Sequence, residues 1–474
     1  MPIRYKIFGK QEYAYRIWNE KINETGQWTQ RSEYLGVVVD KENGIFEKRN
    51  EKKRAEKIAE QKEQGILDYG DCYFFDKFLK TDALFPVIQD VFGKCLDTLL
   101  CLLLYKLHGG SAMCYVETWY DGNIAKILYS NAAVATQRIS EFLNTIGEEK
   151  LQRSFFKNYL ESICGEKSGL IIDSTGLPNQ VNMSITNWGH HDGGIEKEAR
   201  LILAVEKETK MPLYFRYVAG NIGDVSTLTT TIREIKKFGV VPTLSIVDAG
   251  YFSEINIKAL YDGEVSFLTR MPSNRTIYKT LIHEEWAVIE HSGNAVKYGK
   301  RGLFIRKRQI NMYGHLAYAY IVCDPVRRGK EISKKIMELE STDDEFDLEK
   351  CGIMILVSNI DMGIDEVVPL YYSRQMAEQL FGISKDDLSI LPIRTHNEKR
   401  FRGLMLLSFM ALVVYMKIKT TLGSGLTVEQ LLLLMRNLKC KVFHDNSLIV
   451  GEVNKKQRLA FETANILVPK NTGI

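Results

Sequence analysis

"GLIIDST", residues 169–175, is the stretch from which the fold of this 474-residue chain can be worked out. Its apolar residues 170–172 follow one another without polar interruption, as in a strand that is buried on both faces. Asp173 comes directly after them. The stretch therefore predicts a buried strand that ends in a carboxylate.

More strands and helices follow this strand in a regular order. Six elements can be assigned: two strands around a turn in "RLILAVEKETKMPLYFRYVAGN" (200–221), a helix in "DVSTLTTTIREIKKFG" (224–239), a strand in "PTLSIVDAG" (242–250), a helix in "SEINIKALYDG" (253–263) and a strand in "VSFLTR" (265–270). Three strands, a helix and then alternating strands and helices indicate an α/β fold whose sheet mixes antiparallel and parallel pairs.

Four further regions surround or interrupt this sheet. Residues 1–45 alternate as strands do, and "EYLGVVVDKENGIF" predicts a hairpin around Lys41–Gly44. Residues 84–165 have the periodicity of helices, and residues 426–474 resemble a small helical tail. Residues 271–364 predict a β-rich insertion with four strand-like pieces, "WAVIEH", "GLFIRKRQI", "LAYAYIVC" and "GIMILVSN", and one charged helical piece near 329–350.

The predicted organisation therefore has four parts. Residues 1–165 form an N-terminal hairpin plus a helical region, and residues 166–270 together with 365–425 form the mixed-sheet core. The β-rich insertion (271–364) interrupts the core, and the helical C-terminal tail (426–474) follows it.

The composition is that of a soluble globular protein, with 45% hydrophobic and 26% charged residues. The net charge is only +4, so no strong overall field points to a polyanionic partner. Two local basic clusters, "KYGKRGLFIRKR" (297–308) and "IRTHNEKRFRG" (393–403), favour a phosphate-contacting surface modestly, because most such clusters are simply solvated.

Nothing in the sequence predicts secretion or membrane insertion. The eight cysteines include no Cys-x-x-Cys pair, which argues against a zinc module or a disulfide framework. The N-terminal residues lack the apolar stretch of a signal peptide, and the longest apolar run (404–416) is too short to span a bilayer. We therefore expect a cytoplasmic protein without a membrane partner.

Carboxylates follow two of the predicted strands, and a third lies on a later helix. Asp173 and Asp248 each end an apolar run, at the edge of an α/β sheet where reactive groups collect. Taken alone, each aspartate is equally well explained as a helix cap or a turn residue. In "YYSRQMAEQLFGISK" (371–385), Glu378 lies between two bases on one predicted helical face.

That helical face has two interpretations. Tyr371, Arg374, Glu378 and Lys385 fall on one side, whereas Leu380 and other apolar residues face the opposite way. The simpler interpretation is a solvated face with an Arg374–Glu378 pair, which would contribute about 0.3–0.5 kcal/mol. The alternative is a site in which Glu378 joins the two aspartates.

Three carboxylates without histidine or cysteine ligands suit hard divalent cations such as Mg²⁺. Two such ions can activate an attacking oxygen and stabilise a leaving oxygen at phosphorus. Arg374 and Lys385 would then hold phosphates, and Tyr371 would contact sugar or phosphate. Glu398, in "THNEKR", is a rival third acid that lacks the regularly spaced bases around Glu378.

The motifs together carry a family resemblance. "IIDSTG", "IVDAGYFS" and the Tyr-x2-Arg-x3-Glu-x6-Lys series stand in this order, with the insertion before the third. The chain thereby resembles insertion-sequence transposases of the DD(E) type that carry the YREK signature. "PLYFRYVAGNIGD" is similar to the family's Gly-Asn-x-x-Asp turn, which ends here at Asp224, and "LPIRTHNEKRFRGLMLLSFMALVV" resembles the segment after the catalytic helix. The good match covers residues 165–425.

This resemblance implies an RNase H-like core that uses two Mg²⁺ or Mn²⁺ ions. Asp173, Asp248 and Glu378 match the three metal-binding acids, and Tyr371, Arg374 and Lys385 match the other signature positions. The implied reaction is hydrolysis at the ends of the element to free a 3′-hydroxyl, which then attacks target DNA. Ala249 departs from the pattern, because a basic or other polar residue is common there.

The resemblance also sets the expected partners. Double-stranded DNA, as terminal inverted repeats and as target, is the predicted substrate, and a homodimer is expected in the DNA complex. The region 1–165 would bind DNA or dimerise. Within the basic cluster 393–403, the residues predicted to contact DNA are Arg394, Lys399 and Arg400.

Two alternatives to a DNA transposase stay open from the sequence. One is an RNase H-like nuclease that cuts without strand transfer. The other is a catalytically inactive, DNA-binding relic of a transposase, against which the presence of all three acids argues.

Overall fold

The structure is a computed structural model of the chain, and it divides into two compact units. It describes residues 2–9, 11–21, 28–48, 63–110, 112–165, 167–191, 194–338, 347–444 and 447–470. One unit comprises Met1–Leu67, Lys439–Glu452 and Pro469–Ile474, and the other comprises Asp68–Leu438 and Val453–Val468. The predicted boundaries at residues 165 and 426 do not coincide with these units.

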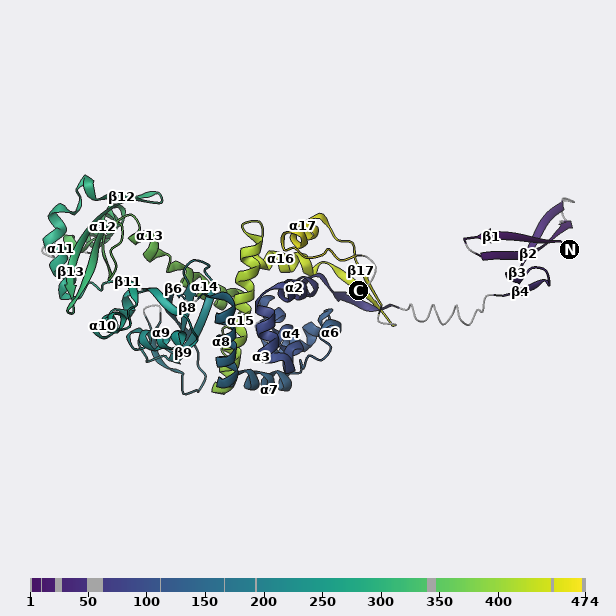
Figure 1. The fold of residues 1–474 in the computed structure, drawn as a ribbon, viewed down its shortest axis with the longest axis horizontal. Helices are drawn as coiled ribbons and strands as arrows, with labels where there is room; N and C mark the ends of the chain where they lie inside the picture. The colour runs from purple at the N-terminus through teal and green to yellow at the C-terminus, as the bar shows by residue number, and fades with distance from the viewer. Residues whose placement is uncertain are drawn as a thin grey trace. The chain divides into compact units, whose positions relative to one another are not determined.

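The first unit contains two small sheets (Figure 1). The first sheet runs in the order β1 (Ile3–Phe8), β2 (Gln11–Lys21), β3 (Trp28–Asp40) and β4 (Ile45–Glu47), all antiparallel. Strands β3 and β4 flank residues 41–44, so the predicted hairpin is confirmed. The second sheet contains β5 (Glu63–Asp68), β16 (Lys439–Phe443) and β17 (Leu448–Val450).

Strands β16 and β17 show that the prediction of a purely helical C-terminal tail was wrong. In β16, Lys439 and Lys441 are exposed, whereas Cys440 and Val442 are buried. This alternation has the period of a strand that is covered on one face, and it is too short to be distinguished from a loop in the sequence. Helices α16 (Val428–Arg436) and α17 (Lys455–Thr463) form the rest of this region.

A ten-stranded mixed sheet organises the second unit. Its strands are β6 (Lys167–Pro178), β7 (Asn187–His191), β8 (Gly194–Glu206), β9 (Pro212–Ala219), β10 (Val241–Val247), β11 (Ser266–Arg270), β12 (Ala295–Tyr298), β13 (Arg301–Met312), β14 (His315–Cys323) and β15 (Ile353–Ser358). Strand β6 pairs antiparallel with β8 and parallel with β10. Strand β8 pairs antiparallel with β9, and β10 pairs parallel with β11. The predicted mixed α/β sheet is thus present, and β6 is the strand at which its antiparallel part (β8, β9) meets its parallel part (β10, β11).

The segment 271–364 continues this sheet. Strand β15 pairs antiparallel with β11, and β14, β13 and β12 follow it outward. Three of the four predicted strands in the segment are confirmed as β13, β14 and β15, and the charged helical piece is α12 (Pro325–Met337). The fourth piece, "WAVIEH", was assigned wrongly, because it belongs to helix α11 (Thr276–Ile289). Buried positions 278, 281, 282, 285 and 289 of α11 follow helical spacing, which outweighs the short apolar run at 286–289.

Helices cover the sheet and form the region before it (Figure 1). Those that precede the sheet are α2 (Gly70–Thr81), α3 (Leu84–Phe92), α4 (Leu96–Leu107), α5 (Val116–Asp121), α6 (Ala125–Leu128), α7 (Thr136–Ile146) and α8 (Glu149–Ile163). Those within or after it include α9 (Leu228–Lys237), α10 (Glu254–Asp262), α13 (Val367–Tyr372), α14 (Gln375–Gly382) and α15 (Glu398–Leu422). The predicted helical character of residues 84–165 is confirmed.

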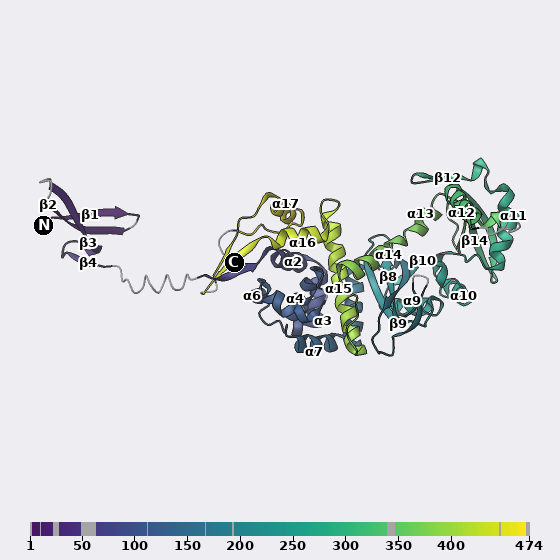
Figure 2. The ribbon, with the colours of Figure 1, turned by 180° about the vertical axis from the view of Figure 1, so that it is seen from behind.

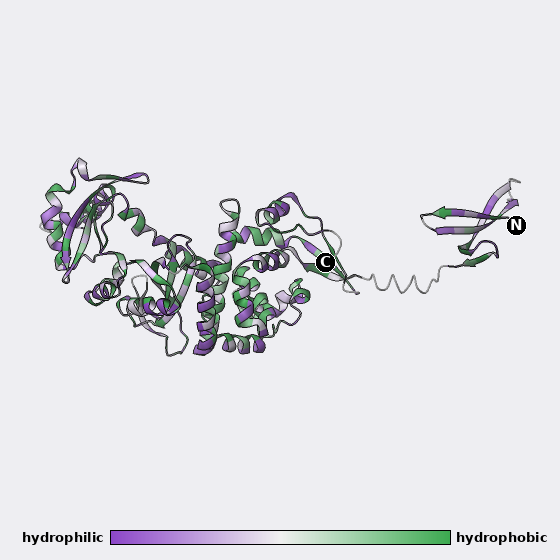
Figure 3. Cartoon of the chain, viewed as in Figure 1, coloured by the Kyte–Doolittle hydropathy of each residue, from purple (hydrophilic) through white to green (hydrophobic). Residues whose placement is uncertain are grey.

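Helix α15 joins the helical region to the sheet. It packs against α4 and α7 and also against β9, and both views show it between these elements (Figures 1 and 2). In Figure 3 helix α4 is largely hydrophobic, in keeping with its place in the core. By length and composition α15 could cross a membrane, but 83% of its most apolar window is buried inside the protein, as in a core helix.

Candidate active site

The central pair of parallel strands brings Asp173 and Asp248 side by side. Ile172 of β6 lies opposite Val247 of β10, and each aspartate is the next residue along its strand. In a parallel pair the residues that follow two register partners are neighbours. Strand β6 continues beyond Asp173 to Pro178, paired with β8, so the prediction that Asp173 ends the strand was wrong.

The sequence predicted one continuous helix over residues 371–385, and this prediction was wrong. Helix α13 ends at Tyr372, α14 begins at Gln375, and a π-helical turn, η7 (Ile383–Asp387), follows α14. The amides of residues 376 and 377 bond three residues back, and that of Leu388 bonds five residues back, to Ile383. These tighter and wider turns change the rotation per residue, yet Tyr371, Arg374 and Lys385 still reach β6 or the residue after β10.

Arg374 joins the three predicted acids. Its Nη1 lies 3.0 Å from Oδ2 of Asp173, and its Nη2 lies 3.0 Å from Oε1 of Glu378. The same Nη2 lies 3.8 Å from Oδ1 of Asp248. One guanidinium therefore touches all three carboxylates, which come from positions far apart along the chain.

The other two signature side chains complete this cluster. The hydroxyl of Tyr371 donates to Oδ1 of Asp248 at 2.9 Å. Nζ of Lys385 donates to the hydroxyl of Thr175 at 2.8 Å, and Thr175 lies two residues beyond Asp173 on the same face of β6. We call these seven residues the acid cluster: Tyr371, Arg374, Glu378, Lys385, Asp173, Asp248 and Thr175. Sequence reasoning missed Thr175, although its spacing of two from Asp173 placed it on the same face.

The charges in the acid cluster strongly affect one another. Burial raises the pKa of Asp173 from its ordinary value of 3.8 to about 7, and the negative charges of Asp248 and Glu378 add to this rise. Arg374 opposes the rise but does not outweigh the burial. Burial and the charge of Asp248 also raise the pKa of Tyr371, so its phenol keeps its proton and can donate it in the bond to Asp248.

The raised pKa of Asp173 predicts how stability depends on pH. Between pH 4 and 7 the folded protein holds a proton on Asp173 that the unfolded chain has lost, so stability falls as pH rises through this window. We expect Asp173→Asn to remove this dependence and to stabilise the metal-free protein at pH 8 by up to about 4 kcal/mol, the equivalent of three pKa units. Thermal unfolding of both proteins at pH 5 and pH 8 tests this; an equal difference in Tm at the two values contradicts it.

A divalent cation fits the acid cluster by its chemistry. All three acidic side chains offer oxygen donors, and their negative charge already attracts a cation, the Arg374 guanidinium. With Arg374 in this position, no group of three His, Cys, Asp or Glu side chains within the described residues is close enough to hold one ion. The donor set therefore fits a hard metal ion by its chemistry, provided that the guanidinium moves away and the carboxylates come closer together.

Asp224 connects the elements that carry the two aspartates. Its Oδ1 accepts a hydrogen bond from Oγ of Ser174 at 2.6 Å and from Nη1 of Arg200 at 3.0 Å. Its Oδ2 lies close to Gly250: a Cβ atom added to Gly250 would be 2.8 Å from that oxygen. Asp224 thus links the residue after Asp173 to the turn after Asp248. The sequence singled out Asp224 as the last residue of a turn and gave no sign of these contacts.

We expect Asp224→Ala to lower the Tm by about 4 °C, because it leaves Arg200, which is 15% exposed, without this carboxylate. Loss of the Asp224 contacts should also let strand β6 move relative to the turn after Asp248. This movement should weaken any activity of the acid cluster. Differential scanning calorimetry of the variant measures the first effect. Asp262→Ala, at an exposed acid on α10, is the matched control and should change the Tm by less than about 1 °C; equal shifts in both variants would contradict the role of Asp224.

The remaining predicted residues lie outside the acid cluster. Arg394 and Arg400 line a separate pocket near the start of α15, and Lys399 pairs with Glu148 at 3.0 Å. The rival acid Glu398 accepts a hydrogen bond from Ser184 at 2.6 Å and lies 3.8 Å from Arg402. The geometry therefore favours Glu378 over Glu398 as the partner of the two aspartates.

Comparison with known proteins identifies the family of the chain. The model of the transposase DDE domain family matches residues 165–414, more than half of the chain. No curated protein matches the chain. Among solved structures, the cryo-EM structure of the piggyBac transposase synaptic complex with hairpin DNA matches with a TM-score of 0.40 and 10% identity, over 64% of this chain and 57% of that one. On the strength of the family match over residues 165–414, which include Asp173, Asp248 and Glu378, the chain belongs to the DDE-domain transposases.

Proposed function

We propose that this transposase hydrolyses phosphodiester bonds at the ends of an insertion sequence and transfers the freed 3′-hydroxyl strand into target DNA. The observation that carries the proposal is the meeting of Asp173, Asp248 and Glu378 around one arginine. Three acids around one partly exposed arginine would contribute little to stability as surface ion pairs. Removing these charged groups from water costs free energy, and a role in binding and chemistry explains why the arrangement is kept despite this cost.

The three carboxylates of Asp173, Asp248 and Glu378 would hold two Mg²⁺ or Mn²⁺ ions. When bound, such ions activate the attacking oxygen and stabilise the leaving oxygen at phosphorus. Because Asp173 must lose its proton to act as a ligand, metal binding should become tighter as pH rises toward its pKa of about 7 and above.

The signature side chains would place the DNA strand beside these acids. Arg374 is 19% exposed. Once metal ions occupy the carboxylates, its guanidinium can leave them and bind a backbone phosphate instead. Lys385 lies beside Thr175 on β6, where its ammonium can contact a second phosphate. Tyr371 holds Asp248 in orientation through its hydroxyl. This assignment is the YREK role that the resemblance implies.

We also propose that β9-β8-β6-β10-β11 is an RNase H-like core. Three antiparallel strands are joined there to two parallel ones, and both aspartates lie on the central pair, which supports the proposal. The region 1–165 is proposed to bind terminal repeats or to dimerise, and the protein to act as a homodimer on double-stranded DNA in the cytoplasm.

A strand-transfer assay tests the proposed function. The purified full chain is incubated with duplexes taken from the DNA that flanks its own reading frame, with a supercoiled plasmid as target and with Mg²⁺, Mn²⁺ or chelator. We expect end cleavage and joined products only when a divalent ion is present. Nicks without joined products would favour the nuclease alternative, and cleavage undiminished in chelator would contradict a metal-dependent reaction.

A further inference from the structure

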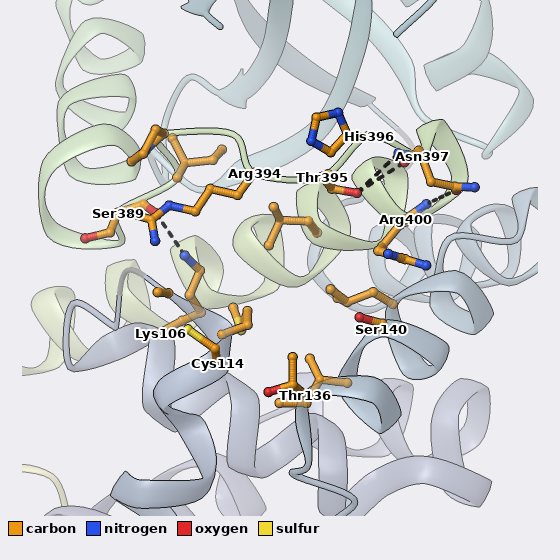
Figure 4. A pocket seen from close by; sticks show the side chains of 17 residues that line it. Lys106, Cys114, Thr136, Ser140, Ser389, Arg394, Thr395, His396, Asn397 and Arg400 are labelled. Carbon is orange, nitrogen blue, oxygen red and sulfur yellow. Dashed lines mark hydrogen bonds between the residues drawn. The ribbon is translucent and has the colours of Figure 1, made fainter. Parts of the chain in front are cut away.

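A second pocket lies apart from the acid cluster and shares none of its residues (Figure 4). It has a volume of about 410 Å³, which is within the range of small-molecule sites. Its walls come from α4, α7, the short helix η2 (Met113–Tyr115), residues 389–397 and the first turns of α15. These elements all belong to one compact unit.

The polar lining of this pocket is cationic. It includes three cationic side chains, Lys106, Arg394 and Arg400, and the described residues that line it include no aspartate or glutamate. Figure 4 draws Lys106 and Arg394 toward one end of the pocket and Arg400 toward the other. A lining with several cations and no carboxylate attracts an anion.

Lys106 is the first of two observations that point to a ligand. Its side chain is 1% exposed, and its ammonium donates to the carbonyl oxygens of Leu388 at 2.8 Å and Ser389 at 3.0 Å. Both partners are neutral, and burial lowers the pKa of Lys106 to about 8. A buried ammonium usually has an acidic partner, so an anion in the pocket would supply a missing counter-charge.

Arg400 is the second observation. Its Nε is buried and has no hydrogen-bond partner within the part of the chain that the structure describes. Its backbone amide is satisfied by the side chain of Asn397, which caps the 25-residue helix α15. The orphaned donor therefore belongs to the guanidinium and lies at the positive end of a long helix, where an anion is favoured.

The other walls of the pocket are apolar. They include Ile139 and Leu143 of α7, Ile390 and Pro392, and Leu404 of α15. Inorganic phosphate would leave these walls uncovered, whereas a planar base attached to a phosphate would cover them. The hydroxyls of Thr136 and Ser140 offer hydrogen-bond partners to the sugar or the base.

We propose that this pocket binds one nucleotide unit, with the phosphate toward the lysine and arginines and the base against the apolar wall. A free mononucleotide and a nucleotide of a bound DNA strand share this chemistry. Binding of a DNA strand to the pocket rests on the proposed function, whereas binding of a free mononucleotide does not. In both cases binding requires neither metal nor cleavage.

Binding to the full-length protein in chelator tests the proposal. Calorimetry with dAMP, deoxyadenosine and inorganic phosphate, and fluorescence anisotropy with a labelled single-stranded 12-mer, cover both sources. We expect at least one of the two probes, dAMP or the 12-mer, to bind. If dAMP binds, its affinity should be at least tenfold higher than that of deoxyadenosine or of inorganic phosphate.

Matched variants identify the site. Arg400→Gln and Lys106→Met should each weaken binding by tenfold or more, and circular dichroism checks that Lys106→Met is folded. Arg138→Gln is the control, because Arg138 lies on the same helix as Ile139 but is 67% exposed, pairs with Glu141 and does not line the pocket. The affinity of the Arg138→Gln variant for both probes should stay within twofold of that of the unmodified protein.

The two probes distinguish the source of the nucleotide. Weaker dAMP binding in Arg400→Gln with an unchanged 12-mer affinity indicates a free nucleotide, whereas a weaker 12-mer affinity indicates a DNA strand. Unchanged affinity for both probes in Arg400→Gln, or binding of neither probe to the unmodified protein, overturns the proposal. Asp173→Ala should retain pocket binding, so loss of cleavage in that variant bears on the proposed function alone.

Discussion

Alanine in place of Asp173, Asp248 or Glu378 is expected to lower metal-dependent cleavage of the element's end DNA by about 1,000-fold or more. Each substitution removes a carboxylate that would hold the ions, and the loss of several kcal/mol of transition-state stabilisation corresponds to a factor of this size. Binding to the same DNA should change little, because the acids contribute no attraction to phosphates. Cleavage is followed on gels and binding by anisotropy.

Glu398→Ala is the matched control for Glu378→Ala. Both glutamates lie near the start of a late helix, but Glu398 contacts Ser184 and Arg402 instead of the acid cluster. Its substitution should leave cleavage within about tenfold of the unmodified enzyme. Loss of cleavage in Glu398→Ala, together with activity in Glu378→Ala, would exchange the roles of the two residues and contradict the proposed site.

Arg374→Gln is expected to change metal binding and cleavage in opposite directions. In the structure the guanidinium occupies the space between the three carboxylates, so a metal ion must displace it. Removing the positive charge should tighten Mn²⁺ binding in the absence of DNA by about tenfold, or about 1.4 kcal/mol. Cleavage should nevertheless fall by about 100-fold, because the proposed charged hydrogen bond from the guanidinium to a backbone phosphate is lost.

Mn²⁺ binding to the variant can be measured by electron paramagnetic resonance of the free ion. Arg402→Gln serves as the control, because Arg402 is also partly buried but pairs with Glu398 and Tyr217. It should leave the Mn²⁺ affinity unchanged. Weaker Mn²⁺ binding in Arg374→Gln would show that the arginine helps to build the metal site and does not compete for it.

Much of the site could be predicted from the sequence because its acids are marked by local patterns. Apolar runs identified the strands before Asp173 and Asp248, and the spacing around Glu378 identified the signature helix. The register that places Ile172 opposite Val247 could not be predicted, since it depends on pairing between distant segments. The bridging position of Arg374 depends on that register.

Other features escaped prediction for related reasons. The break between α13 and α14 and the π-helical turn after α14 leave the helical periodicity of the sequence almost unchanged. The contacts of Asp224 with Ser174 and Arg200 join residues that are distant in sequence, and no local pattern encodes them. The assignment of "WAVIEH" failed because a short apolar run is weaker evidence than the helical spacing of the 14-residue helix that contains most of it.

The central claim is that Asp173, Asp248 and Glu378 together hold divalent ions. An anomalous difference map from crystals of the protein soaked in Mn²⁺ at pH 8 measures this most directly. We expect Mn²⁺ peaks bonded to the carboxylates of Asp173 and Asp248, with Glu378 beside them and the Arg374 guanidinium displaced. A map with no Mn²⁺ at these carboxylates, and with Arg374 still bridging all three, would contradict it.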